Sequence, residues 1–349
     1  MKRLLLYPFE TDMLPFVLHI CRHPNSYELA AVCAENSTGL VGKDVGFSWN
    51  LEDIGIQVMN DPVKYLDSCD AVCILPHKNL DITNLVKSAS ALGKEILDYG
   101  DMPCEGTSLT SEQKILGEFE KLGAKAMLDF ETPIIEVGGL IETSDKDQIT
   151  LSLMDGLRGE GLSVSVFSDH DFIRFAGGHN FQSIYENDFS ASAMSLNHFI
   201  RAIELYEKPD VMIVQVPGNL FRHDNKLIGD LGISAFLFSQ IFVPDYFIAS
   251  VMLGTYPIEF WDSIRGSLKS RFGLSLDAVH ISNKTMIPDL SEEEGRMSFY
   301  QNAICNVRTA VDANRKCAPF PVGNLFEAND LKEIIQDIFK KMTATEGDA

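Results

Sequence analysis

The chain has 349 residues, 45% of them hydrophobic, and 50 acidic against 29 basic residues give it a formal net charge of −21. This length and apolar content allow two domains with ordinary cores, whereas so acidic a surface repels phosphate backbones and argues against nucleic acid as a partner. No apolar run approaches the roughly 20 residues of a membrane span. Pro8 and Glu10 interrupt the first apolar run too early for a signal segment, so we expect a cytoplasmic protein.

Cysteine and histidine usage indicates neither disulfides nor a metal site. The seven cysteines are odd in number and widely scattered, which argues against a disulfide framework. The eight histidines include no pair with zinc-ligand spacing beside a second such pair. We therefore predict no protein-only metal centre.

Residues 1–128 are predicted to form a Rossmann-like domain. Short apolar strands alternate with helical patterns, which implies a parallel sheet covered on both faces. The strands are expected at 4–7, 29–33, 56–59, 71–75 and 95–97, and the helices at 12–21, from 62, 82–92 and 112–122. The first strand–helix turn, residues 8–12, contains no glycine, so a dinucleotide pyrophosphate could not approach the backbone there. Ordinary NAD or FAD binding is not expected.

Residues 129–342 are predicted to form a second α/β domain, and 343–349 a frayed tail. A short strand at 126–128 leads into this domain. Further strands are expected at 134–137, 162–167, 211–216, 245–251 and, as the last one, 278–282; helices are expected at 147–158, 192–206, 232–242, 260–272, from 291 and at 331–342. The predicted fold class is thus α/β, with two three-layer αβα domains.

The stretch 133–169 carries the strongest functional signal. It reads strand, loop, helix, strand, and such a first loop is where α/β proteins cradle phosphates on helix N–H groups. Gly138 and Gly139 end the first strand, and Lys146 stands where a P-loop lysine would. The motif G-x-x-x-x-G-K-[ST] is otherwise lost. Leu140, Asp145 and Asp147 occupy its first glycine, its second glycine and its hydroxyl position.

Two interpretations of this degenerate P-loop remain open. In one, the loop binds something other than a bare nucleotide triphosphate, or binds through a divalent cation held by Glu142, Asp145 or Asp147. In the other, Ser144 or Asp145 is an N-cap and Asp147 or Gln148 completes a capping box. The second requires no ligand.

Two more loops could contribute to a site. The strand 211–216 ends at Gln215 and is followed by Gly218, Asn219 and His223, at the edge where open α/β sheets bind ligands; the same residues could form an ordinary turn. Downstream of the second strand of the central unit, Asp169-His170-Asp171 could orient an acid–base imidazole, or could be solvated loop charge. His179 lies in a glycine-containing loop just beyond.

The order of these motifs resembles a known family of two-domain proteins. The matching residues are Leu6–Phe9 with Pro15, Gly39-Leu40-x-Gly42-Lys43-Asp44, Gly139-Leu140-x-Glu142-x-x-Asp145-Lys146, Gly178-His179-x-Phe181 and Val216-Pro217-Gly218. The chain is similar to proteins that join a Rossmann-like domain to a P-loop NTPase-like domain. Some members of that family are D-glutamate N-acetyltransferases. The nearer resemblance is to peptide maturation system proteins of clostridial-type clusters, encoded beside a radical SAM maturase and a cysteine-rich precursor peptide.

The resemblance implies an accessory role in maturing a ribosomally synthesised, post-translationally modified peptide natural product. The ligand or peptide would bind between residues 138–147 and 215–225, and nucleotide hydrolysis would be weak or absent. One alternative is a nucleotide- or acyl-CoA-dependent acyl transferase or ligase acting on an amino acid or peptide. Another is a non-catalytic scaffold for the maturase or the precursor peptide. The apolar segment 233–242 is expected to be a core helix or a homodimer contact.

Overall fold

The computed structural model describes residues 1–22, 27–49, 51, 53–75, 77, 80–99, 115, 117, 125–141, 145–185, 188–222, 231–295 and 297–346. The chain divides into two compact units, Met1–Ser108 and Leu109–Ala349. The predicted boundary lies later, at residue 129. The predicted helix 112–122 lies almost entirely outside the described residues.

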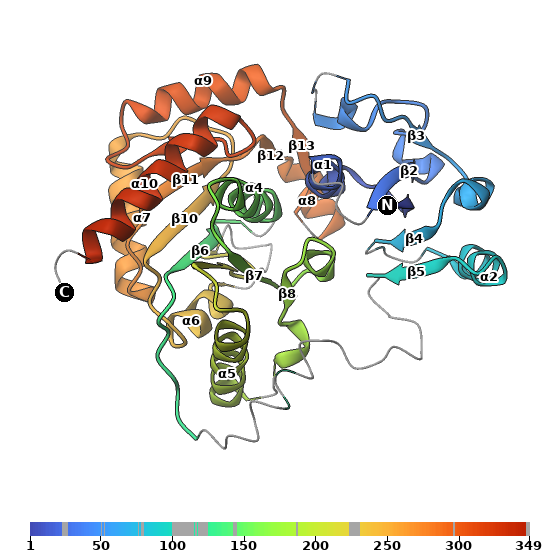
Figure 1. Ribbon diagram of the computed structural model, residues 1–349. Coiled ribbons are helices and arrows are strands. Elements are labelled where there is room, and N and C mark those ends of the chain that lie inside the picture. The colour runs from blue at the N-terminus through green and yellow to red at the C-terminus, as the bar shows by residue number, and fades with distance from the viewer. Residues whose placement is uncertain are drawn as a thin grey trace. The chain divides into compact units, whose positions relative to one another are not determined.

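The first unit is a five-stranded parallel sheet with the strand order β3-β2-β1-β4-β5 (Figure 1). Its strands are β1 (Lys2–Tyr7), β2 (Tyr27–Cys33), β3 (Val58–Met59), β4 (Ala71–Ile74) and β5 (Glu95–Asp98). Its helices are α1 (Leu14–Arg22) and α2 (Thr83–Ala91), with the 3-10 turns η1 (Thr11–Met13), η2 (Asn36–Thr38), η3 (Val45–Trp49) and η4 (Pro62–Ser68). The central strand β1 buries Leu4, Leu5 and Leu6 completely, as expected of a parallel strand covered on both faces.

The second unit is built on a seven-stranded parallel sheet with the order β14-β11-β10-β6-β9-β7-β8 (Figure 1). The strands are β6 (Ile134–Gly139), β7 (Val164–Ser168), β8 (His179–Asn180), β9 (Val211–Gln215), β10 (Tyr246–Val251), β11 (Ala278–Ile281) and β14 (Val322–Gly323). The helices are α4 (Lys146–Gly159), α5 (Phe189–Glu207), α6 (Ile233–Ser239), α7 (Ile258–Phe272), α8 (Pro288–Glu294), α9 (Ile304–Arg315) and α10 (Ala328–Glu346), with 3-10 turns η5 (Asp171–Arg174) and η6 (Gln182–Ile184).

Helices cover both faces of this sheet, so the predicted α/β class is confirmed. A large apolar cluster joins one face to α5, α6, α7 and α9. The helices α4 and α10 pack against each other, and the Tyr246 hydroxyl on β10 donates to Asp337 on α10 over 2.8 Å. Gly156 permits the close approach of these two helices, because a Cβ there would lie 2.3 Å from the Ile335 Cδ1 atom.

Several predicted elements differ in the structure. Residues 126–128 form no strand; instead the backbone of Leu128 exchanges hydrogen bonds with the Asn197 amide on α5, over 2.8 and 2.9 Å. The strand at 278–281 is not the last, because the antiparallel pair β12 (Lys284–Met286) and β13 (Phe299–Gln301) and the edge strand β14 follow it. Helix α6 ends three residues before the predicted Phe242, and α10 continues to Glu346, into the segment expected to fray. Among the described helices, none is both long enough and apolar enough to cross a bilayer.

Candidate functional site

The candidate site lies at the carboxyl edge of the second sheet, where strand order changes direction. From β6 the chain passes through α4 towards the β9–β7 side, whereas from β10 it continues to β11 and β14 on the other side. Open α/β sheets bind ligands outside the carboxyl ends of the strands at such a switch point. The helix α4 begins here.

Lys146, the first residue of α4, connects this helix to the end of β9. Its Nζ atom donates to the carbonyl oxygens of Val216 and Gly218, over 2.8 and 3.0 Å, and the residue is only 5% exposed. Gly218 has a φ of +67°, the left-handed conformation that glycine adopts without strain. The lysine therefore holds the turn after β9 against the start of α4.

Asp145, which stands at the position of the motif's second glycine, has a backbone conformation that favours glycine. Its φ is +58° and its ψ +24°, a left-handed conformation that aspartate tolerates better than most residues. In this conformation its side chain makes no capping hydrogen bond to α4. The first-turn N–H groups of α4, which have no acceptor within the helix, are thus left uncovered by Asp145.

The Asp145 carboxylate instead forms a buried cluster at the end of β11. It accepts a 2.6 Å hydrogen bond from the Ser282 hydroxyl, and it lies 3.3 Å from Lys284 Nζ and 3.5 Å from His280 Nε2. Burial alone would raise the pKa of Asp145, but Lys284, His280 and Ser282 outweigh it and bring that pKa down to about 2. Asp145 is therefore an anion with its own buried counter-ion.

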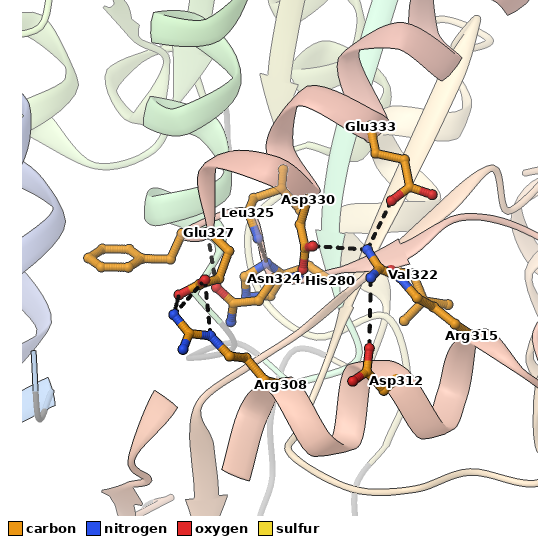
Figure 2. Close-up of polar contacts among 11 residues, drawn as sticks. His280, Arg308, Asp312, Arg315, Val322, Asn324, Leu325, Glu327, Asp330 and Glu333 are labelled. Carbon is orange, nitrogen blue, oxygen red and sulfur yellow. Dashed lines mark hydrogen bonds and ion pairs between the residues drawn. The ribbon is translucent and has the colours of Figure 1, made fainter. Parts of the chain in front are cut away.

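A backbone hydrogen bond fixes the orientation of His280. Its Nδ1 atom accepts from the N–H of Leu325, over 3.1 Å (Figure 2). A neutral imidazole accepting at Nδ1 carries its proton on Nε2. That proton faces the Asp145 carboxylate.

A second polar chain links Asp147 to β9. Gln215 Nε2 donates to Asp147 over 2.7 Å, and the Thr150 hydroxyl donates to Gln215 Oε1 over 2.8 Å. On its other side Asp147 contacts His170 Nδ1 at 2.8 Å. The Asp147 carboxylate raises the pKa of His170 to about 9, so this half-exposed imidazole is a cation at neutral pH. It adds positive charge beside the start of α4.

The structure brings together four of the predicted site residues: Lys146 with Gly218, and Asp147 with Gln215. Gly138 and Gly139 lie within β6 and are not loop glycines. Asn219 is buried in the turn after β9. Glu142 and His223 lie outside the described residues.

His179 lies apart from this cluster. It belongs to the edge strand β8, and its Nε2 atom contacts Glu207, at the end of α5, over 3.0 Å. Glu207 also accepts a 2.5 Å hydrogen bond from the Ser165 hydroxyl. This arrangement ties α5 to β7 and β8.

Sequence reasoning missed Ser282, Lys284 and His280 as site residues. The sequence did contain a signal for them, because all three lie in or just after the predicted strand 278–282, at its carboxyl end. The carboxyl ends of parallel strands share one edge of a sheet. Their approach to Asp145 depends on the order of the strands, which the sequence does not state.

Among the described residues of this edge, the protein side chains alone form no metal centre. Within the described ranges, no group of three or more His, Cys, Asp or Glu side chains is arranged to hold a metal ion. The acidic residues fit this result, since Asp145 pairs with Lys284 and Asp147 with His170.

No family model and no curated protein matches this chain. Among solved structures, a DUF1611 family protein from Anabaena variabilis ATCC 29413 is similar over 97% of this chain and 100% of its own, with a TM-score of 0.57 and 10% identity. The chloroplast FtsY from Physcomitrella patens matches 74% of this chain and 81% of its own, with a TM-score of 0.33 and 13% identity. A pseudomurein peptide ligase type C from Methanothermus fervidus matches 73% of this chain and 38% of its own, with a TM-score of 0.25 and 11% identity. The first likeness shows a shared fold along nearly the whole chain. The other two are too distant to support an argument.

Proposed function

We propose that the second unit binds the carboxylate or phosphate group of a small ligand or peptide at the start of α4. The observation that carries this proposal is the left-handed Asp145, whose side chain makes no capping hydrogen bond to α4 and pairs with Lys284 and Ser282 instead. Helix N-termini attract anions because N–H groups and the helix dipole point at the ligand. Lys146 and the His170 imidazolium supply nearby positive charge.

The same residues argue against efficient nucleotide hydrolysis. A P-loop enzyme holds magnesium with the hydroxyl after its lysine and with an acid from the neighbouring strand. Here those positions are Asp147, paired with His170, and Gln215, which donates to Asp147. We therefore expect anion binding with weak or absent turnover of ATP or GTP.

The wider role that we propose is an accessory one in the maturation of a ribosomally synthesised peptide. The order of motifs supports this role through the family resemblance, and the net charge of −21 suits a partner with a basic segment, such as a precursor leader peptide. A radical SAM maturase is the alternative partner. In either case the protein would act by binding.

An acyl transferase or ligase is a second candidate, and one observation favours it. The Asp147–His170 pair presents a carboxylate-oriented imidazole at the same edge of the sheet. An imidazolium with a pKa of about 9 could donate a proton to a leaving group. Turnover of ATP or acetyl-CoA that is lost in His170→Asn and kept in Lys332→Ala would favour this candidate.

Calorimetric titration tests the binding proposal, with pyrophosphate, ATP, acetyl-CoA and the precursor peptide as separate ligands. At least one should bind, and Lys146→Ala should weaken that binding by about 10-fold or more, the usual worth of a charged hydrogen bond. Lys332→Ala is the matched control, because Lys332 is an exposed lysine of α10 in the same unit. Equal affinity of the wild type and a folded Lys146→Ala variant would contradict a site at α4. Peptide binding that is unchanged in Lys146→Ala would indicate the scaffold role instead.

A further inference from the structure

The central strand of the second sheet carries a buried carboxyl group that nothing in the proposed anion site uses. Glu136, in β6, is 1% exposed, and neither of its carboxyl oxygens has a hydrogen-bond partner among the residues that the structure describes. Its neighbours in register are Val214 on β9 and Phe247 on β10. Burial raises the pKa of Glu136 to about 8. Buried polar groups in native proteins are nearly always paired, so an orphan of this kind calls for an explanation.

Glu136 lies on the face of the sheet opposite the Asp145 cluster. Residues that pair across a parallel sheet share a face, and Val214 and Phe247 belong to the apolar cluster under α5, α6 and α7. Asp145, by contrast, contacts His280 on β11. The residue before His280, Val279, belongs to the apolar cluster. Since successive residues of a strand point to opposite faces, His280 points to the other face of the sheet. The two sites are therefore separated by the sheet, and Glu136 lies in the middle of β6.

Between Glu136 and the carboxyl edge of the sheet, the next positions of β6 and β10 on this face carry small residues. Two residues further along β6, about 7 Å away, is Gly138, and it pairs with Ala249 on β10. The space above them is filled by Leu220. A Cβ on Gly138 would lie 3.2 Å from both Leu220 methyl carbons and 3.1 Å from the Phe247 ring. The Leu220 side chain thus packs over Gly138, the residue next to Glu136 on this face of β6.

We propose that Glu136 is the anionic residue of a second binding subsite, which takes a protonated alkyl amine in the space that Leu220 fills in this structure. An ammonium group would give the carboxylate both a counter-charge and hydrogen-bond donors, which it lacks here. The alkyl chain would replace the Leu220 isobutyl group against Phe247. Binding would ionise Glu136 and release its proton to solvent. This subsite does not depend on anion binding at α4.

Thermal unfolding in the presence of n-butylammonium chloride tests the subsite. At about tenfold excess over Kd, the amine should raise the Tm of the wild type by about 2–4 °C, and n-butanol at the same concentration should not. Glu136→Gln, which keeps the side-chain shape and removes the charge, should abolish the rise. Leu220→Ala, which empties the space, should give a larger rise in Tm than the wild type shows.

Leu157→Ala is the control for an engineered cavity. Leu157 is also fully buried, but it belongs to α4 and lies outside the cluster around Glu136. The amine should not act on this variant more than on the wild type. An absent rise in the wild type, or an equal rise in Glu136→Gln, would overturn the proposal. Pyrophosphate binding should be the same in Glu136→Gln as in the wild type, so failure of this subsite would leave the anion site standing.

Discussion

A single residue, Asp145, shows how an acid is accommodated at a motif position where the backbone favours glycine. An unpaired acid beside Lys146 would repel an anion at the start of α4. The left-handed conformation instead directs the carboxylate towards Ser282 and Lys284. The negative charge therefore has a counter-ion, and the conflict is relieved within the protein.

This pairing predicts a strong coupling between Asp145 and Lys284. Asp145→Asn tolerates the left-handed backbone but removes the carboxylate that the buried Lys284 pairs with, at a cost of about 3–5 kcal/mol. Lys284→Met should be similarly costly alone. The double variant should lose clearly less than the sum of the two, by about 1–3 kcal/mol. Urea unfolding of the four proteins measures the cycle, and simple additivity would mean that the pair does not interact.

At the scale of elements, the sequence predicted what long apolar patterns encode. The strands β6, β9 and β10 are entirely buried and consist mostly of apolar residues, with Glu136 as the one charged residue among them. Helix α9 was missed because only four of its residues, Val307, Ala310, Val311 and Asn314, are buried, which gives a weak pattern. The strands β8, β13 and β14, of two or three residues each, are too short for any periodicity. The same limit applies to the site. Lys146 could be predicted from a sequence motif, whereas predicting Lys284 as a site residue would have required the order of the strands.

Helices α9 and α10 are held to the edge strand β14 by one arginine, which predicts a specific sensitivity. Arg315 donates to the Val322 carbonyl at 2.8 Å, to Asp330 at 2.9 Å and to Glu333 at 3.0 Å (Figure 2). A lysine cannot reproduce this fork. Because Arg315 is partly exposed, we expect Arg315→Lys to destabilise the protein by only about 1 kcal/mol.

Arg308→Lys is the matched control for that substitution. Arg308 also contacts an acid, Glu327, but its side chain is 61% exposed and binds no second acid in the described part of the chain. Its replacement should cost less than about 0.5 kcal/mol. Denaturant midpoints of the two variants measure the difference. Equal losses of unfolding free energy would show that the three hydrogen bonds of Arg315 stabilise the protein no more than the single ion pair of Arg308.

At the scale of the whole molecule, charge and burial together favour mildly acidic conditions. The formal net charge of −21 at pH 7 opposes compaction by self-repulsion, and lowering the pH reduces it. Two individual groups also favour the folded protein at lower pH. Glu136 ordinarily has a pKa of 4.5, which burial raises to about 8, and His170 ordinarily has 6.5, which Asp147 raises to about 9.

These shifts predict that stability falls as the pH rises from about 5 to 9. The unfolded chain ionises Glu136 from pH 4.5, whereas the folded protein keeps it neutral until about 8, so folding loses up to about 1.4 kcal/mol per pH unit in that interval. The stabilising His170–Asp147 pair is complete below pH 6.5 and is lost as the pH rises through about 9. Tm measured across this range should decline steadily in the wild type. Glu136→Gln should flatten the decline below pH 8, and His170→Asn should flatten the part above 6.5. A wild-type profile that rises with pH, or an unchanged slope in Glu136→Gln, would show that Glu136 is not neutral in the folded protein.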